Sequence, residues 1–541
     1  MINNSHVTHS AQAPWQVMEP DRTVRLVLRA ARGTLKRVDC LLCDPCDTEL
    51  DPEGAAIPHL ATQNVPLTYM DSEFEYFVLR KRMETHKLRY HFLLHTQDGT
   101  FLLDERGVTR SFEERFIRPF FVSFVFDAAV KAAPDWASEM VWYQIFPDRF
   151  QRSADEKDWK SEPVTDREAR FGGDLNGIRS AIPYLKRLGV TGVYFNPIFS
   201  AGSVHRYDTI DYRTIDPLLG SQEDFIRLCD ALHENGMRVM LDGVFNHGSW
   251  KSLPFQDVVA RGAASPYFDW FEVNDANTLA EYVSGNQAGH SPYHTFAFAP
   301  DMPKWNTNNP AVQEYLIDAA EYWTRLCGID SWRLDVPDEL HPSFLRVFHQ
   351  RMKAIDPNLY IIGEIWSDPT RWLVDGVFDG VMNYPVYYAI RDFFVLREIN
   401  AVAFCDRVTR YLAFTPESWQ KGMFQFCSTH DIPRILWLAK GNRKAVLNAY
   451  QMAAMFAGGI SVYYGDELLL SGGFDPDNRR CMPWDREKQE PFSGELFERG
   501  PGPELALVLQ RGGDHPAQAG VDGRGLPAEL VAVQRHPGLE P

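Results

Sequence analysis

Four short segments of this chain contain acidic side chains. Each segment lies at the end of an apolar run or directly after one. They are 242–247 (DGVFNH), 332–336 (WRLDV), 363–366 (GEIW) and 428–431 (STHD). Each apolar run is typical of a buried strand, and each segment places a carboxylate at the exit of that strand. Three separated acids, accompanied by histidine or arginine, suit a reaction that protonates a leaving group and stabilises a cation. Cleavage of a glycosidic bond is such a reaction.

Two of the acids carry most of this signal. Arg333 and Asp335 are two residues apart on one predicted strand, so their side chains share a face, and the arginine would keep Asp335 ionised as a nucleophile. Glu364 has apolar neighbours in sequence, and a carboxyl group in apolar surroundings has a raised pKa and can act as a general acid. Placing an acidic side chain at the end of a buried apolar run costs free energy. This cost argues against a purely structural role for Asp335 or Glu364.

The polar residues of the other segments are weaker signals when each is taken alone. Asp431 offers a third carboxylate, and His430 and His247 offer hydrogen-bond donors for sugar hydroxyls. Alone, His247 could begin a helix, His430 could be a buried, hydrogen-bonded histidine, and Asp431 could be a turn residue. Their order along the chain, together with the two stronger acids, favours one common site.

The elements that must position these acids follow from the apolar pattern. From Trp142 onward, short apolar strands alternate with helical stretches, which is typical of parallel βαβ units. Eight such units predict an α/β fold, a (β/α)8 TIM barrel, whose active residues lie at the C-terminal strand ends. An insertion at about 248–308 follows the third strand and is expected to build the binding face. The predicted strands lie near 141–146, 192–197, 238–245, 329–335, 359–364, 377–382, 423–428 and 460–464.

The parts of the chain on either side of the barrel differ in composition. Residues 1–130 contain alternating polar and apolar runs between turn signals, which predicts an N-terminal β-sandwich. The barrel is assigned to 131–497. Residues 498–541 contain no aromatic residue, no lysine and no isoleucine and are dense in glycine and proline. We therefore expect an irregular tail.

Charge and hydropathy exclude some partners. The 541 residues carry a formal net charge of −18, which argues against nucleic acid because phosphates attract lysine and arginine. No apolar run reaches transmembrane length, so no membrane partner is expected. The first ten residues lack a basic region followed by an apolar one, which predicts no signal peptide and a cytoplasmic location.

These motifs together resemble glycoside hydrolase family 13, the α-amylase family. Within it the chain is most similar to the neopullulanases, cyclomaltodextrinases and maltogenic amylases. The four segments match the family's four conserved regions, and the resemblance covers about 1–490, including a starch-binding-like module at 1–130. Further matching segments are 142–150, 171–174, 205–212 and 302–306 (MPKWN).

The resemblance implies a role for each site residue in retaining cleavage of α-1,4-glucosidic bonds, and of some α-1,6 bonds. Asp335 would be the nucleophile that forms a glycosyl-enzyme ester, Glu364 the acid and base, and Asp431 the transition-state stabiliser. The first two carboxylates would lie about 5–5.5 Å apart. The implied substrate-binding residues are Arg333, His247, His430, Asp242 and Tyr207, with His205 and Trp366 as outer contacts.

Three departures from the family pattern bear on these expectations. No cofactor is expected to be required: calcium is doubtful because Arg152 lies in the loop that usually supplies its ligands, although Gly172 and Asp174 remain as candidates. Residues 336–339 (VPDE) stand where Val-Ala-Asn-Glu is common, at a place that bears on acceptor subsites. The expected C-terminal β-sandwich is not recognisable after about 494, and a frameshift near 498 would explain the tail.

Three functions remain open from the sequence. The leading one is a hydrolase acting on cyclodextrins, maltooligosaccharides or pullulan. The near alternative is an α-glucan transglycosidase with the same catalytic residues, and a non-catalytic glucan-binding protein with a truncated barrel is the third. The resemblance also implies a homodimer, in which the N-terminal module of one subunit covers the partner's active site and favours small substrates.

Overall fold

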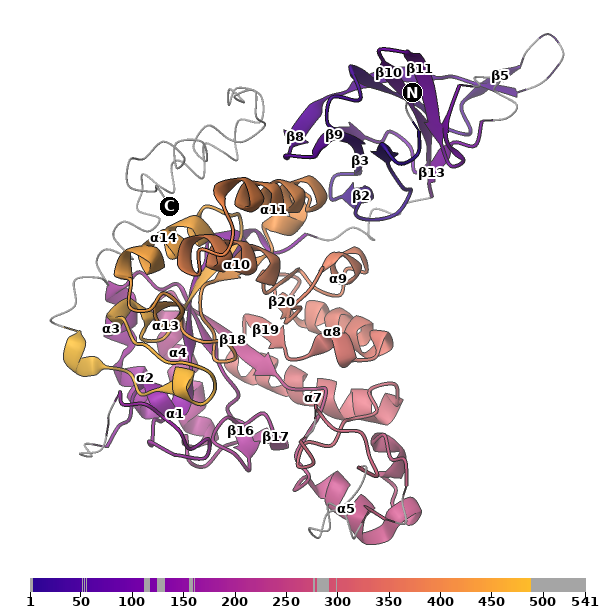
Figure 1. Cartoon of the computed structure of the whole chain (residues 1–541). Helices are drawn as coiled ribbons and strands as arrows, with labels where there is room; N and C mark the ends of the chain where they lie inside the picture. The colour runs from indigo at the N-terminus through magenta and orange to yellow at the C-terminus, as the bar shows by residue number, and fades with distance from the viewer. Residues whose placement is uncertain are drawn as a thin grey trace.

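The structure is a computed structural model that places an N-terminal β module beside a larger α/β part (Figure 1). It describes residues 3–50, 52, 54, 56–110, 117–123, 132–154, 159, 161–275, 278–279, 291–297 and 299–487. The expectations for the tail at 498–541, the frameshift and the missing C-terminal β-sandwich lie outside the described residues.

The N-terminal module consists of two antiparallel sheets, which confirms the predicted β-sandwich. Leu26 and Leu28 from one sheet share a buried core with Tyr90 and Phe92 from the other. The first sheet contains β1 (Val7–Thr8), β2 (Gln16–Glu19), β3 (Thr23–Ala31), β8 (Leu67–Met70) and β9 (Phe74–Arg82). The second contains β4 (Arg37–Cys43), β7 (Ala61–Val65), β10 (Leu88–Thr96), β11 (Gly99–Asp104), β12 (Gly107–Thr109) and β13 (Phe120–Val122).

Eight parallel strands form the barrel, and all eight predicted strands are present. The strands pair in chain order from the first to the sixth, and the eighth pairs with both the first and the seventh. A parallel bridge between Met382 and Phe424 joins the remaining two edges. The strands are β14 (Val141–Ile145), β15 (Gly192–Phe195), β18 (Arg238–Gly243), β19 (Ser331–Leu334), β20 (Tyr360–Gly363), β21 (Gly380–Val381), β22 (Phe424–Phe426) and β23 (Gly459–Tyr463).

Side chains alternate between the barrel interior and the helical layer around it, as the pleat of a strand requires. Trp142 of β14 belongs to an interior cluster with Tyr360 and Phe424. Its neighbour Tyr143 belongs to the large outer core between strands and helices. The helices are α1 (Pro147–Phe150), α2 (Leu175–Ser180), α3 (Ile182–Arg187), α4 (Gln222–Glu234), α7 (Pro310–Cys327), α8 (Pro342–Ile355), α9 (Thr370–Val374), α10 (Tyr384–Ile390), α11 (Ala401–Phe414), α12 (Glu417–Gln420), α13 (Ile435–Leu438) and α14 (Arg443–Ala454).

Local sequence signals set the ends of α7, the longest helix among the described residues. The Asn309 side chain accepts a hydrogen bond from the Ala311 N–H, at 2.9 Å, and Pro310 takes the first helical position. Both features are typical of helix starts. Gly328 ends the helix with φ 62°, in the left-handed region that glycine adopts at little cost.

The insertion after β18 folds back onto the catalytic end of the barrel. It begins with α5 (Leu253–Arg261), the lowest helix in Figure 1. Isolated bridges then join Phe271 to Trp305 and His247 to Lys304. The buried Trp305 ring stacks on Phe271 with centroids 4.6 Å apart, so the insertion is anchored beside the predicted site residue His247.

The N-terminal module contacts its own barrel through α11. Arg25 of β3 donates a 2.7 Å hydrogen bond to the carbonyl of Ala413, and the Ser72 hydroxyl donates one of 2.6 Å to Asp406. The Phe414 ring meets Trp15 edge to face, with centroids 4.7 Å apart. Polar and apolar contacts together fix the module against this helix.

Candidate active site

The predicted acids lie at the C-terminal ends of neighbouring barrel strands. Asp242 is the second-last residue of β18. Asp335 follows β19 directly, and Glu364 follows β20 directly. The strand register places Asp242 opposite Arg333. Because parallel strands keep side chains at paired positions on the same face, this register brings the acids around one arginine.

Arg333 is the centre of the acidic cluster and is fully buried. Its Nη1 atom donates hydrogen bonds to Asp242 Oδ1 at 2.7 Å and to Asp335 Oδ1 at 2.8 Å. Its Nη2 atom lies 2.8 Å from Glu364 Oε2 and 3.9 Å from Asp431 Oδ2. One guanidinium therefore holds the three predicted catalytic acids and Asp242 in one site.

The cluster contains more carboxyl groups than cations. This excess of negative charge favours the protonated form of the carboxyl groups. Burial raises the pKa of Asp335 and of Asp242, although the charge of Arg333 opposes both shifts. Burial, followed by the charge of Glu364, raises the pKa of Asp431 to about 7. Four carboxyl groups around one guanidinium cannot all be ionised at low cost. The crowding of these carboxyl groups therefore favours keeping at least one of them protonated.

Glu364 is surrounded by hydrogen-bond donors, which corrects the expectation of apolar surroundings. Besides Arg333, the indole Nε1–H of Trp366 donates to its Oε1 at 3.0 Å, and the Val336 backbone N–H donates to its Oε2 at 3.2 Å. The apolar sequence neighbour Trp366 thus presents its polar edge to the carboxylate. Sequence adjacency predicted the residue but not the orientation of its ring.

A second hydrogen-bond network positions Asp242 and His430. Asp242 Oδ2 accepts hydrogen bonds from the hydroxyls of Tyr194 at 2.8 Å and Tyr207 at 2.9 Å. The Tyr207 hydroxyl is also hydrogen-bonded to His430 Nε2, and the two rings stack with centroids 5.3 Å apart. The structure therefore brings Tyr207, His430 and Asp242 together, as the resemblance implied.

Sequence reasoning missed three members of this network. They are Tyr194, Gln144 and Asn196. Gln144 Nε2 lies 2.9 Å from His430 Nδ1 and 3.2 Å from Asn196 Oδ1. A polar residue inside the apolar run of β14 was the signal that could have identified Gln144, because such a residue is buried only with partners.

Two other predicted histidines lie in the same region and are neutral. Burial lowers the pKa of both His205 and His247 to about 3. The Tyr207 N–H donates to His205 Nδ1 at 3.0 Å, and His247 stacks on Phe296 with centroids 4.6 Å apart. The Trp366 ring, 43% exposed, stacks on Tyr384 at 4.2 Å. His205 and His247 thus lie neutral in the same region, whereas Trp366 presents part of its ring to solvent.

The neutral state of His247 predicts how stability depends on pH. The unfolded chain binds a proton near pH 6.5 and the folded chain only near pH 3, so stability from this residue falls as pH falls through that window. Replacing His247 by asparagine should therefore remove about 1.4 kcal/mol per pH unit from the decrease in the free energy of unfolding between pH 6 and pH 4. Denaturant unfolding of both chains at the two pH values tests this, with the exposed His294→Asn as control. Parallel pH curves for wild type and His247→Asn would contradict it.

The two residues suggested for calcium take part in hydrogen bonds of the loop and of helix α2. Asp174 caps α2 by accepting the Gly177 N–H at 2.6 Å, and its other oxygen accepts the Ser153 hydroxyl at 2.7 Å. The Gly172 N–H donates to Asp148 at 3.2 Å. No group of three or more histidine, cysteine or acidic residues able to hold a metal occurs among the described residues.

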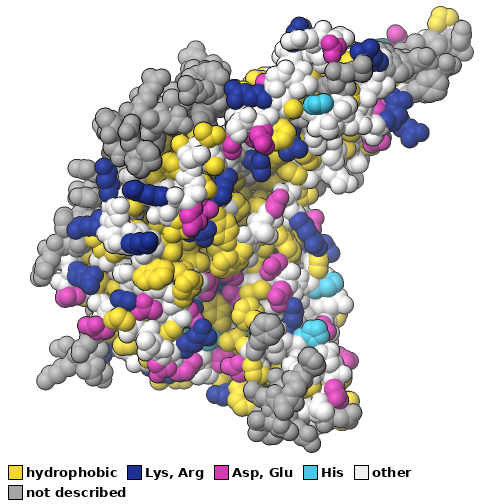
Figure 2. Space-filling view, viewed as in Figure 1, with side chains coloured by type: hydrophobic (Ala, Val, Ile, Leu, Met, Phe, Trp, Pro, Cys, Tyr) yellow, Lys and Arg dark blue, Asp and Glu magenta, His cyan; other side chains and the backbone are white. Residues whose placement is uncertain are grey.

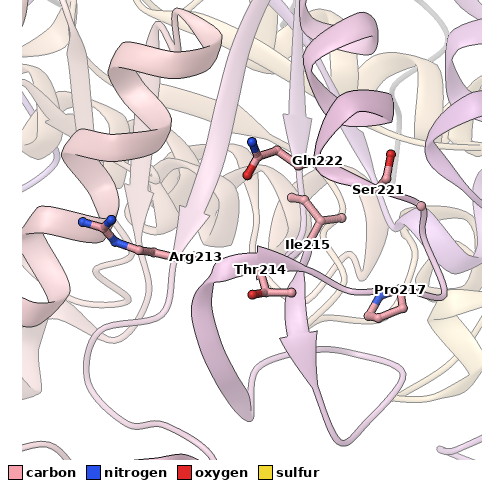
Figure 3. Close-up of a pocket in the computed structure, with 7 residues that line it drawn as sticks. Arg213, Thr214, Ile215, Pro217, Ser221 and Gln222 are labelled. Atoms are coloured by element: carbon pink, nitrogen blue, oxygen red, sulfur yellow. The ribbon is translucent and has the colours of Figure 1, made fainter.

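A separate pocket of about 540 Å³ lies between β17 (Thr209–Ile215) and the start of α4 (Figure 3). Its one charged lining residue, Arg213, is paired with Asp318. The lining contains none of the predicted site residues, so the pocket is distinct from the acidic cluster.

Comparison with known proteins decides the family. Residues 144–497 match the α-amylase catalytic domain, and residues 1–127 match the α-amylase N-terminal Ig-like domain. The chain belongs to the α-amylase family. As a member with the acidic site described above, it is a glycoside hydrolase.

Individual relatives agree with this assignment. A cyclomaltodextrinase of Geobacillus thermopakistaniensis is 39% identical over 483 residues, which cover 88% of this chain and 79% of the relative. Neopullulanase 2 of Thermoactinomyces vulgaris is 35% identical over 491 residues, or 89% of this chain and 81% of the relative. A solved cyclomaltodextrinase structure is 34% identical and superposes with a TM-score of 0.83 over 93% of this chain and 85% of its own. Within the described part of this α-amylase family chain, no helix is both long and apolar enough to span a bilayer.

Proposed function

We propose that the protein hydrolyses α-1,4-glucosidic bonds, and some α-1,6 bonds, with retention of configuration. The substrates would be cyclodextrins, maltooligosaccharides or pullulan. The observation that carries this proposal is the joint contact of Arg333 with Asp335 and Glu364, each at 2.8 Å. Relatives named cyclomaltodextrinase and neopullulanase support the substrate classes.

The geometry supports a two-step mechanism. In the first step an oxygen of Asp335 attacks the anomeric carbon, the bond to the leaving sugar breaks, and Glu364 gives its proton to the departing oxygen. Asp431 would hold hydroxyls of the attacked glucose. In the second step Glu364 takes a proton from water, the resulting hydroxide attacks the anomeric carbon, and Asp335 leaves as a carboxylate. Arg333 stays bonded to the acids throughout.

The alternatives predict different products. A transglycosidase would return longer oligosaccharides, because a sugar hydroxyl replaces water in the second step. A non-catalytic glucan-binding protein would return none. The test is the product profile from β-cyclodextrin, pullulan and starch. Short linear products without longer ones support hydrolysis, whereas dominant transfer products favour the transglycosidase.

Cofactor use and location remain proposals. No cofactor is expected to be required, which the occupied oxygens of Asp174 support. Full activity after exhaustive treatment with a chelator would agree with this. A cytoplasmic location stays a prediction, which fractionation of the native source would test.

A homodimer is the proposed assembly, with the N-terminal module of each subunit narrowing the partner's cleft. Removing residues 1–130 should then lower kcat/KM on β-cyclodextrin relative to starch about fivefold or more, since a fivefold change corresponds to about 1 kcal/mol, the loss of one well-packed interface side chain. The same deletion should convert the dimer to a monomer in sedimentation. Because deletion uncovers Phe414, both chains should also be measured with Phe414→Ser as a matched control. A monomeric full-length chain with an unchanged substrate ratio after deletion would refute the proposal.

A further inference from the structure

Two exposed aromatic side chains, Trp437 and Phe474, lie together at the catalytic end of the barrel. Trp437 is on α13, which follows the seventh strand, and Phe474 is on the loop that follows the eighth. They are 43% and 71% exposed, and their ring centroids lie 5.9 Å apart at an angle of 70°. Hydrophobic side chains gather on the face of the molecule over α13 (Figure 2). Exposed apolar surface that is held together in this way marks a binding surface.

Hydrogen bonds join the two segments that carry these rings. The buried Arg434, at the start of α13, donates its N–H to the Gly472 carbonyl at 3.0 Å and its Nε–H to the Asn478 carbonyl at 2.8 Å. The Trp437 ring lies so close to Gly473 that a Cβ at that position would meet it at 3.4 Å. The loop 472–478 and α13 are therefore held together before a ligand binds. The loss of conformational entropy on binding should consequently be small.

The same unit continues to the catalytic acids. Asn478 Nδ2 donates to the carbonyl of His430 at 2.7 Å. Arg479 lies 3.7 Å from Asp431 Oδ1 through Nη2 and 2.9 Å from Asp475 Oδ1 through Nη1. Asp475 is the direct neighbour of Phe474. Charged groups that can bind hydroxyls thus extend from the third acid of the cluster to the aromatic pair.

We propose that Trp437 and Phe474 form an aromatic platform that binds a glucose ring of an α-glucan chain, away from the bond being cleaved. A glucose ring presents C–H groups on its faces and hydroxyls at its rim, so its face suits a flat aromatic ring and its rim suits charged groups. The charged path back to Asp431 favours a sugar chain over a second protein molecule. This inference rests on the proposed function, and it concerns chain-length preference rather than bond cleavage itself.

The double variant Trp437→Ala/Phe474→Ala tests the platform. Its kcat/KM on maltoheptaose should fall about fivefold to tenfold, which corresponds to the loss of one or two ring contacts, while that on maltotriose stays within about twofold. Trp437→Phe and Phe474→Tyr keep the rings and should keep the preference for the longer chain. Leu326→Ala is the matched control, because Leu326 is 38% exposed at the end of α7, on the opposite end of the barrel.

Binding separates this inference from the proposed function. In the Asp335→Asn background, titration calorimetry with maltotriose and maltoheptaose measures affinity without turnover. Weaker binding of maltoheptaose alone in the double variant supports the platform, even if the parent chain hydrolyses neither sugar and the proposed function fails. Hydrolysis with an unchanged length preference overturns the platform and leaves the function intact. An equal loss on both sugars, or a loss of dimer with no change in preference, also overturns it.

Discussion

Replacing Asp335 by asparagine is expected to lower kcat on maltooligosaccharides by about four orders of magnitude, while sugar affinity changes little. The amide keeps the volume of the side chain, and its oxygen can still accept the 2.8 Å hydrogen bond from Arg333 Nη1. It cannot form the ester with the anomeric carbon. Transition-state stabilisation is therefore lost, and ground-state binding is retained.

The fold should tolerate this change. Burial and the neighbouring carboxylates raise the pKa of Asp335, so its charged form is costly in this site, and the neutral amide of asparagine removes that cost. The melting temperature should consequently stay close to that of the parent. Asp318→Asn, which changes a half-exposed acid of α7 paired with Arg213, is the control and should leave kcat within about twofold. Activity of Asp335→Asn within tenfold of the parent would contradict the assignment of the nucleophile.

The positions of the acids along the fold were predictable because local patterns determine them. Apolar β-branched runs bury themselves as strands, and the residue that ends each run must lie at the strand end. Asp335 and Glu364 follow β19 and β20 directly, as their sequences indicated. The parallel arrangement then assigns both acids to the same end of the barrel.

The contacts among these side chains were not predictable to the same extent. Arg333 bonds Asp242 across 91 positions in the chain, and Gln144 lies beside His430 across 286 positions. Such contacts depend on strand register and on which rotamer each side chain adopts, and a single sequence does not encode either as a local pattern. The same limit explains why Trp366 was predicted near Glu364 but its N–H donation was not.

Contacts between the N-terminal module and the barrel, and between distant segments of the barrel, could likewise not be predicted from local sequence patterns. Phe414 ends an amphipathic helix, and its sequence neighbours do not distinguish a barrel core position from a contact with Trp15 of the N-terminal module. Trp437 lies on α13 after the seventh strand and Phe474 on the loop after the eighth, and nothing in the sequence of either segment indicates that the two rings meet. Both features became visible only when the barrel placed distant loops together.

Glu364 offers the second large effect, because its contribution should depend on the leaving group. A general acid stabilises the transition state by giving a proton to the departing oxygen, and an activated aryl oxygen leaves without that help. Glu364→Gln cannot donate this proton. We expect kcat/KM on maltotriose to fall by about three to four orders of magnitude, and that on an activated aryl maltoside by about tenfold to a hundredfold.

The surroundings of Glu364 make glutamine a sharp test of this role. The side-chain oxygen of glutamine, placed where Oε2 lies, can keep the contacts with Arg333 and with the Val336 N–H, whereas its NH2 group would then face the indole N–H of Trp366. Val336 has φ 43°, which is costly for a β-branched residue, and its N–H bond to Glu364 helps to hold that conformation. A purely structural role would therefore disturb the segment next to Asp335 and reduce both substrates equally. Unequal losses, measured with an unchanged melting temperature, would identify proton donation as the function of Glu364.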